Sequence, residues 1–213
     1  MTAPRLYTYF RSGAAHRVRI ALALKGIAYD SVPVHLVRDG GEHRTPAYRA
    51  LNPQARVPAL QLPSGDVLIQ SPAILEYLEE TVPHPPLLPR DPVARAKVRG
   101  VAAIIGCDVH PLNNVAVLNT LRGLGHDEAA VLAWIARWIT DGFAAVEQLI
   151  GDDGWCFAPA PGLADVYLVP QLFSARRFRV RLDGFPRIAR VAALAAAHPD
   201  FIAAAPENQP DAE

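Results

Sequence analysis

Hydrophobic residues in the first part of the chain alternate between the spacing of strands and the spacing of helices. The apolar positions from Ala14 to Lys25 repeat at helical spacing up to Gly26, and a second apolar helical stripe follows Ser71. Short apolar segments predict strands at residues 6–9, 29–36, 60–62 and 67–69. The order strand, helix, strand, irregular segment, two strands and helix predicts βαβ units on a mixed sheet, which is an α/β domain.

The pattern changes after a proline-rich stretch at 83–92, in which neither a helix nor a central strand persists. The apolar positions after it have helical spacing throughout. Helices are predicted at residues 93–121, 128–150, 163–178, 185–197 and 199–205. We therefore expect a domain at 1–82, a linker at 83–92 and an all-helical domain at 93–213, with a polar tail from Pro206 that is loosely ordered unless it docks.

The charge balance narrows the classes of partner. The chain of 213 residues has 21 Lys and Arg against 21 Asp and Glu, so its formal net charge is zero, and the basic residues are scattered. A nucleic-acid-binding patch is therefore not expected. No apolar run reaches the ~20 residues of a membrane span, and the segment Met1-Thr2-Ala3-Pro4 has no apolar signal region. These features predict a soluble cytoplasmic protein.

The two cysteines and one aspartate are interpreted as structural residues. Cys107 and Cys156 lie far apart without metal-ligand spacing, so neither a disulfide framework nor a zinc site is expected, and each is predicted to be a small buried residue. Asp165 follows Gly162 and precedes an apolar run. Its carboxylate is predicted to cap a buried helix.

Two short motifs predict a binding site for a peptide ligand. Pro58 has no N–H and is able to adopt the cis form, which would turn the backbone of Val57 towards an added extended chain. Farther along, Ser71 occupies a predicted N-cap and Pro72 the first helical position, so free N–H groups there would meet a carboxylate. An ordinary turn and an ordinary cap are the alternative interpretation. Together, in this order, the motifs favour glutathione as the ligand.

Three further segments identify a family resemblance. The run Arg11–Leu22 resembles the zeta-class signature of the cytosolic glutathione transferases, in which a small polar triplet precedes an Arg-Val-Arg-Ile-Ala-Leu helix. Segments 108–114 and 205–211 are similar to two other parts of that class. The resemblance covers essentially the whole chain. It implies a thioredoxin-like first domain, a helical second domain and a homodimer.

The resemblance also implies a reaction. Zeta-class enzymes use glutathione to isomerise maleylacetoacetate, or maleylpyruvate in a bacterial branch, to the fumaryl product. The thiolate adds to the cis double bond, the bond rotates, and elimination returns the thiol. Because a free thiol has a pKa near 8.5, the protein must stabilise the thiolate. Ser12, at the start of the first helix, is the expected hydroxyl, although a cap or turn role is the alternative.

The substrate of such an enzyme is a dicarboxylate, which calls for cations placed to bind carboxylates. By resemblance, Arg11 and Arg177 are the expected carboxylate ligands. His110 is expected to hydrogen-bond glutathione or to move a proton. Asp108 and Asn114 are expected to share a face with His110, although a proline follows His110 and should kink the helix there.

The resemblance assigns the remaining contacts with glutathione. Gln70 and Ser71 would hold its γ-glutamyl end, Val57 its cysteinyl backbone and His43 its glycyl end. Two tyrosines in the first strand resemble the catalytic tyrosines of other transferase classes. Their strand positions instead predict core packing for Tyr7 and Tyr9.

Two departures from the zeta pattern keep other functions open. Gly13, Ala14 and Ala15 replace the second hydroxyl or cysteine that relatives have after Ser12, and Val115-Ala116 replaces an Arg-rich continuation of the maleylpyruvate branch. One alternative is a transferase or dehalogenase that conjugates glutathione to small electrophilic acids. Another is a binding or scaffold protein that has lost its chemistry. Arg11, His110 and Arg177 favour the isomerase, because a scaffold protein does not require cationic side chains that converge on one site.

Overall fold

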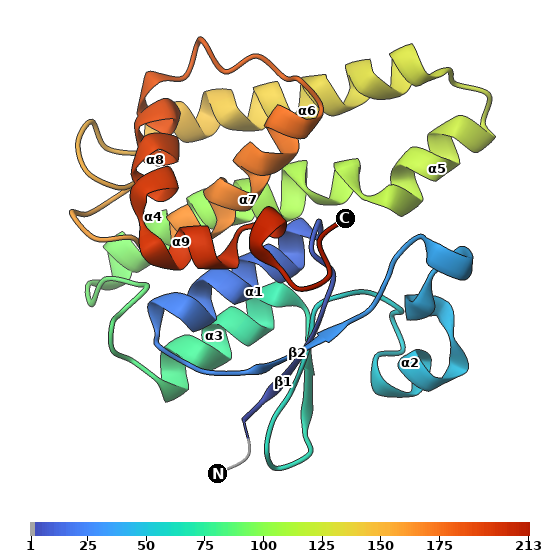
Figure 1. Cartoon of the computed structure of the whole chain (residues 1–213). Coiled ribbons are helices and arrows are strands. Elements are labelled where there is room, and N and C mark those ends of the chain that lie inside the picture. The colour runs from blue at the N-terminus through green and yellow to red at the C-terminus, as the bar shows by residue number, and fades with distance from the viewer. Residues whose placement is uncertain (1–2) are drawn as a thin grey trace. The chain divides into compact units, whose positions relative to one another are not determined.

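The computed structural model describes residues 3–213 of the chain (Figure 1). These residues form two compact units, one up to Pro86 together with Ala197–Glu213, and the other Leu87–Ala196. Met1 and Thr2, the start of the N-terminal segment considered above, lie outside the described residues. The last helix and the tail, expected in the helical domain, pack with the first unit instead.

The first unit contains a four-stranded mixed sheet in the order β2-β1-β3-β4, as expected for the predicted α/β domain. Strand β1 is parallel to β2 and antiparallel to β3, and β3 and β4 form the predicted antiparallel hairpin. The strands are β1 (Arg5–Thr8), β2 (Asp30–Pro33), β3 (Ala59–Gln61) and β4 (Val67–Ile69). The predicted second strand was too long. Beyond Val34 the chain leaves β1, because both backbone groups of His35 bond to Glu42.

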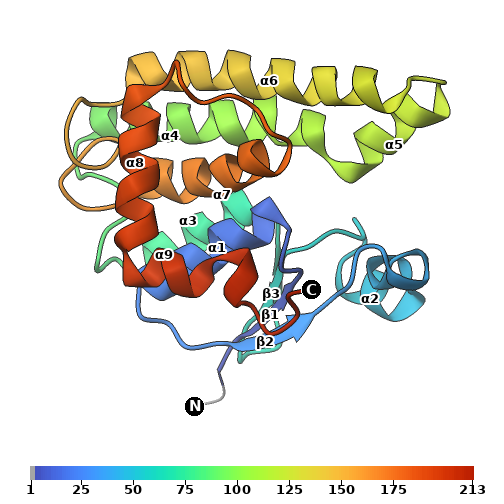
Figure 2. The same cartoon turned by 45° about the horizontal axis from the view of Figure 1, so that its top comes forward.

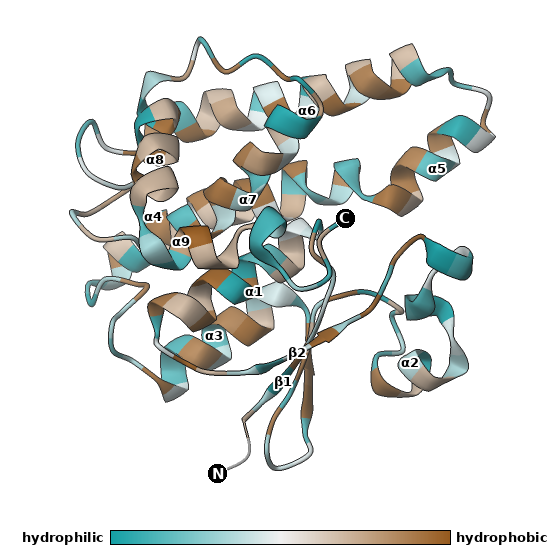
Figure 3. Cartoon of the chain, in the orientation of Figure 1, coloured by the Kyte–Doolittle hydropathy of each residue, from teal (hydrophilic) through white to brown (hydrophobic). Residues whose placement is uncertain are grey.

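Helices cover both faces of this sheet. Figure 1 shows α1 and α3 on one side and α2 on the other. The helices of the unit are α1 (Gly13–Leu24), α2 (Pro46–Leu51), α3 (Ser71–Thr81) and α9 (Pro199–Ala204). Short 3-10 turns, η1 (Arg38–Gly40) and η2 (Glu42–Arg44), precede α2 in a hydrophilic segment (Figure 3). This segment was expected to be irregular, so α2 was not predicted, although its cap Thr45, followed by Pro46, is a helix-start signal.

Helix α1 is the most enclosed element of the first unit, since it packs against both α3 and α9. Residues 15–22 are all buried and include His16, Arg17 and Arg19. The Arg19 guanidinium, with no exposed surface, donates to the Ala204 carbonyl at 3.0 Å and to the Thr8 hydroxyl at 3.0 Å. This arginine therefore ties α1 to both β1 and α9, which explains why the C-terminal helix belongs to this unit.

The second unit is all-helical, as predicted (Figure 2). Its elements are α4 (Pro92–Ala103), a π-helical turn η3 (Ile104–Val109), a 3-10 turn η4 (Pro111–Asn113), α5 (Val115–Gly123), α6 (Glu128–Leu149), α7 (Leu163–Arg177) and α8 (Pro186–Ala197). The single helix predicted at 93–121 is divided by η3 and η4. Pro111 has no N–H to continue an α-helical ladder, so the expected kink lies where the turns change type.

Asp165 caps α7 as predicted. Its two carboxylate oxygens accept the backbone N–H groups of Gly162 at 2.8 Å and Cys156 at 2.9 Å. Burial raises the pKa of Asp165, and these hydrogen bonds oppose that rise. Cys156 is buried as expected, but the prediction for Cys107 was wrong, because its side chain is exposed on η3.

Two helical stretches are long and apolar enough to be candidate membrane spans, although neither contains an uninterrupted apolar run of ~20 residues. By length and composition alone, Pro92–Gly123 and α6 both reach the threshold for a candidate span. Such helices also occur as core helices of soluble proteins. The buried residues of α6 lie three or four positions apart, on one stripe that packs inside the unit: Val131, Ile135, Ile139, Phe143 and Val146. Charged residues such as Arg137 and Asp141 lie on the exposed side.

Candidate functional site

The start of α1 presents Ser12 to an incoming ligand. Ser12 is the N-cap of this helix, and its Oγ accepts the Ala15 N–H at 3.2 Å. Its own N–H donates to the Tyr9 carbonyl at 2.9 Å, which fixes the residue between β1 and the helix. The Ser12 O–H still has a proton to donate, and the helix dipole favours negative charge at this end. Ser12 therefore serves as a helix cap and is suited to stabilising a thiolate.

Arg11 is oriented by two aromatic residues that precede it. Its Nη2 and Nε donate to the Tyr9 hydroxyl at 2.7 and 3.3 Å, and its guanidinium carbon lies 4.9 Å from the centre of the Phe10 ring. Tyr9 is buried, as its strand position predicted, but its role as an acceptor for Arg11 was missed. The guanidinium has further N–H groups with which to bind a carboxylate.

The loop before β3 carries Val57 and Pro58, whose peptide bond is cis as the sequence suggested. Neighbouring side chains fix its course. The Tyr48 hydroxyl and the Asn52 side-chain amide both donate to the Arg56 carbonyl at 2.7 Å. Asn52 is buried, so the backbone immediately before Val57 is held from within the unit.

The residues at the start of α3 differ by one position from the expectation. Gln70, with φ of +71°, is the N-cap, and Ser71 is the first helical residue rather than the cap. The left-handed conformation of Gln70 turns the chain from β4 into the helix without a side-chain cap. The Gln70 side-chain amide donates to the Gln54 side-chain oxygen. Gln54 was missed by sequence reasoning; the preceding Asn52-Pro53 turn was its only local signal.

The register of the sheet brings these loops to one edge. Tyr7 of β1 pairs with Ala59 of β3, and Ala59 pairs with Ile69 of β4. The end of β1, the start of β3 and the end of β4 therefore lie side by side. The segments that carry Ser12, Val57 and Gln70 all leave the sheet at this edge, as a site for one extended peptide requires.

His43 lies apart from that edge, in η2. Burial and then the positive charge of Arg44 lower its pKa, so the imidazole is mainly neutral near pH 7. Gly41, with φ of +100°, has no room for a side chain, because a Cβ there would collide with the His43 ring and the Leu36 carbonyl. A glycine at position 41 therefore lets the backbone pass close to the His43 ring.

The second unit contains the other predicted site residues, and their arrangement corrects one expectation. Asp108 is exposed in the π-helical turn. His110 is half-buried at the end of that turn, where its backbone N–H donates to the Ile105 carbonyl at 2.9 Å. Asn114 lies beyond the 3-10 turn, where its side chain caps α5 by accepting the Ala116 N–H at 3.0 Å. The three residues therefore do not share one helical face, because the helix type changes twice between them.

Arg177 ends α7, and its side chain is exposed. Its guanidinium carbon lies 5.0 Å from the centre of the Phe178 ring. A basic residue at a helix C-terminus interacts favourably with the helix dipole, so a structural role is open to Arg177 besides the predicted one.

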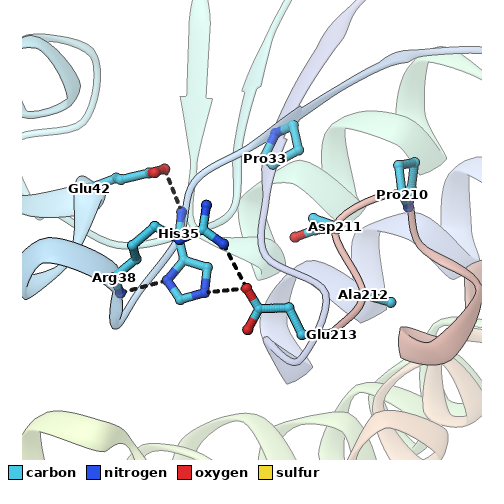
Figure 4. A pocket seen from close by; sticks show the side chains of 8 residues that line it. All are labelled: Pro33, His35, Arg38, Glu42, Pro210, Asp211, Ala212 and Glu213. Atoms are coloured by element: carbon cyan, nitrogen blue, oxygen red, sulfur yellow. Dashed lines mark hydrogen bonds and ion pairs between the residues drawn. The ribbon is translucent and has the colours of Figure 1, made fainter.

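A cavity of about 340 Å³ lies elsewhere in the first unit, between the segment after β2 and the C-terminal tail (Figure 4). Its lining includes His35, Arg38, Asp211 and Glu213. None of the predicted ligands of glutathione lines it. The edge of the sheet described above therefore remains the candidate site.

Comparison with known proteins identifies the family. Residues 11–81 match the family model of the glutathione S-transferase N-terminal domain. A maleylacetoacetate isomerase of Pseudomonas aeruginosa is 67% identical over 97% of this chain and 98% of its own length. The holo structure of a maleylpyruvate isomerase, described as a bacterial glutathione S-transferase of the zeta class, is 50% identical, with a TM-score of 0.94 over 98% of this chain and 100% of that one. This chain belongs to the zeta class of the glutathione S-transferase family.

A further likeness concerns bound ligands. The crystal structure of a maleylacetoacetate isomerase from Methylobacterium extorquens AM1, solved with bound malonate and glutathione, is 36% identical, with a TM-score of 0.91 over 98% of this chain and 99% of that one. The predicted family and fold of this glutathione transferase, a thioredoxin-like domain followed by a helical domain, are thereby confirmed.

Proposed function

We propose that this zeta-class glutathione transferase is a glutathione-dependent cis-trans isomerase that converts a maleyl keto acid to its fumaryl isomer in the breakdown of aromatic compounds. The observation that carries this function is the 67% identity to the Pseudomonas aeruginosa maleylacetoacetate isomerase over almost the entire length of both chains. The glutathione and malonate bound in the Methylobacterium extorquens structure support a thiol cofactor and a dicarboxylate substrate.

The residues at the sheet edge fit glutathione by their chemistry. The start of α3 offers backbone N–H groups for a carboxylate, and the hydrogen-bonded pair Gln54 and Gln70 offers further amide groups beside it. Val57 offers backbone groups for an extended peptide. We assign Gln70 and Ser71 to the γ-glutamyl end, Val57 to the cysteinyl backbone and His43 to the glycyl end. When bound, glutathione supplies a thiolate that adds reversibly to the double bond of the substrate.

Further side chains perform the remaining work in this proposal. Ser12 donates its O–H to the sulfur and, with the N-terminus of α1, stabilises negative charge there. Arg11, held by Tyr9, binds one carboxylate of the substrate, and Arg177 binds the other. His110 holds glutathione or moves a proton while negative charge develops on the keto acid. Asp108 and Asn114 are assigned, with His110, to the residues that bind glutathione.

We further propose maleylacetoacetate as the preferred substrate. The relative with 67% identity is a maleylacetoacetate isomerase, whereas the maleylpyruvate isomerase of known structure is 50% identical. Val115 and Ala116 begin α5 and are both exposed, so this helix starts without the arginines of the maleylpyruvate branch.

The protein is also proposed to be a cytoplasmic homodimer. Of the residues in the most apolar 18-residue stretches of Pro92–Gly123 and α6, only 28% and 33% are buried in the single chain. Val93 and Leu132 are exposed by 63% and 41%. Covering such surface with a second copy would be favourable. Light scattering that gives the mass of a single chain would contradict the dimer.

The activity is tested with purified protein and each maleyl keto acid, with and without glutathione, by following the loss of the cis-enone absorbance. We expect turnover only with glutathione, and a higher kcat/KM for maleylacetoacetate than for maleylpyruvate. Binding of glutathione without consumption of either substrate would contradict the isomerase. Accumulation of a stable glutathione adduct would instead indicate a transferase.

A further inference from the structure

The C-terminal tail of the chain reaches the loop that carries Arg11 and Ser12. The Phe10 N–H donates to Asp211 Oδ2 at 2.9 Å, although 201 positions separate the two residues. Asp211 lines the cavity of Figure 4 together with the end of the tail. Phe10 directly precedes Arg11, and its ring lies against the Arg11 guanidinium. The tail thus bonds to the backbone immediately beside two proposed site residues.

The backbone carbonyl of Phe10 is held by a hydrogen bond as well. Its carbonyl accepts Nη2 of the buried Arg19 at 2.9 Å, so both backbone groups of Phe10 bond to side chains from other parts of the unit. Burial lowers the pKa of Arg19 to about 10, and the negative charge of Asp211 opposes that change. Arg19 and Asp211 are therefore coupled by charge while they hold the same residue.

The tail itself is fixed at several points. The Gln209 side-chain amide donates to the Ala203 and Ala205 carbonyls, each at 2.9 Å. At the very end, Glu213 Oε1 accepts Arg38 Nη2 at 2.7 Å and lies 3.2 Å from His35 Nε2. Because His35 Nδ1 accepts the backbone N–H of Arg38 at 2.7 Å, the ring proton of the neutral imidazole lies on Nε2, the atom that forms the contact with Glu213 (Figure 4). Asp211 is therefore held between two anchored parts of the tail.

We propose that Asp211 is a positioning residue for the isomerisation: its carboxylate fixes the Phe10 peptide, so that Arg11 and Ser12 are placed correctly for the substrate carboxylate and for sulfur. This inference rests on the proposed function. A tail that merely covered the unit would need apolar contacts, whereas this one offers a charged acceptor to a backbone donor beside the site. Asp211 acts through Phe10 and needs no contact with the substrate.

The experiment compares Asp211→Ala and Asp211→Asn with wild type, and uses Glu207→Gln on the exposed surface of the tail as the control. Small misplacements of reacting groups cost large factors in rate, so we expect Asp211→Ala to lower kcat/KM about 10-fold. The KM for the maleyl substrate should rise, and so should the pKa of the bound glutathione thiol, read from thiolate absorbance. Asp211→Asn keeps an acceptor for the Phe10 N–H and should restore kcat/KM to within about threefold of wild type.

A second comparison separates positioning from folding. In an Arg11→Lys background, the effect of Asp211→Ala on the substrate KM should shrink, because Asp211 acts through Arg11. A merely structural role would leave the two effects multiplicative. If Asp211→Ala does not fold, Asp211→Glu is the second variant, because its longer arm misplaces the acceptor while keeping the charge.

The outcomes are distinguishable. If the wild type is active, an unchanged substrate KM and an unchanged thiol pKa in folded Asp211→Ala would overturn the positioning role. Wild-type kinetics in folded Asp211→Glu would overturn it as well. Equal losses in Asp211→Asn and Asp211→Ala would overturn it too, since they would point to charge alone. A wild type and Glu207→Gln that both lack isomerase activity would instead refute the proposed function.

Discussion

The Tyr9 hydroxyl accepts two hydrogen bonds from Arg11, one from Nη2 at 2.7 Å and one from Nε at 3.3 Å. The Tyr9 ring is at the same time part of the core, with its centre 4.9 Å from that of Phe10 and 5.0 Å from that of His35. One residue therefore links the packing of the first unit to the orientation of a proposed substrate ligand.

Removing that hydroxyl tests the link. Tyr9→Phe keeps the ring and deletes the acceptor, so we expect the KM for the maleyl substrate to rise about fivefold, the value of a hydrogen bond of ~1 kcal/mol. The kcat should change less. Tyr7→Phe is the matched control, since its hydroxyl donates to Gln61 Oε1 at 3.3 Å and contacts no proposed ligand. Equal kinetics for the two variants would argue against the role of Tyr9.

Ser12 combines a cap with a proposed catalytic hydroxyl, and two substitutions separate them. Ser12→Ala should lower the free energy of unfolding by ~1 kcal/mol through loss of the cap. It should also lower kcat about 10²-fold through loss of the hydrogen-bond donor. Ser12→Asp still caps the helix, but its charge repels a thiolate, so stability should be kept while activity falls at least as far. Wild-type turnover by Ser12→Asp would contradict the assignment.

His16 should make the protein less stable in mild acid. Burial and the nearby charges of Arg19 and Arg17 hold its pKa well below the ordinary value of 6.5. Below pH 6.5 the unfolded chain binds a proton that the folded protein does not. The free energy of unfolding should therefore fall by ~1.4 kcal/mol per pH unit as the pH decreases from 6.5 towards the lowered pKa.

Chemical denaturation between pH 7 and pH 5 measures this slope. His16→Gln should flatten it, because the amide does not titrate. The control is His126→Gln, which changes an exposed histidine and should leave the slope as in wild type. A slope unchanged by His16→Gln would show that another group is responsible.

Asp165 should have the opposite dependence on pH. Its pKa is raised above the ordinary 3.8, so between 3.8 and the raised value the folded protein keeps a proton that the unfolded chain has lost. The stability contributed by Asp165 is complete below pH 3.8 and is lost as the pH rises through the folded pKa. The difference in unfolding free energy between wild type and Asp165→Asn should therefore be larger at pH 4 than at pH 7. Asp153→Asn, at an exposed carboxylate, should show no such trend.

The sequence predicted most reliably those features that depend on local chemistry. The hairpin of β3 and β4 and the cap of α7 by Asp165 follow from turn residues and capping groups close to the elements they stabilise. The start of α1 at Ser12 follows from a similar short-range pattern. In these places the nearest residues decide the structure.

Features that depend on distant contacts were missed. The tail docks because Asp211 meets Phe10 and Glu213 meets Arg38, and no local pattern connects such residues. Cys107 was predicted to be buried because of its type, but the π-helical turn carries it to the surface. Asn114 was expected to share a face with His110 despite a kink, whereas the change of helix type made it a cap. The predicted catalytic and binding roles themselves stay predictions.

The first and the last of the described residues belong to the same compact unit, with Leu87–Ala196 inserted between them in the sequence. During synthesis the amino-terminal segment therefore emerges long before the last residues that bond to it, and its loop at Phe10 is completed only when Asp211 leaves the ribosome. A purification tag or proteolytic trimming after Gln209 would consequently disturb the loop at Phe10, near the other end of the sequence. Protein that carries the C-terminal tail intact and without a tag is therefore the appropriate reference for every kinetic comparison.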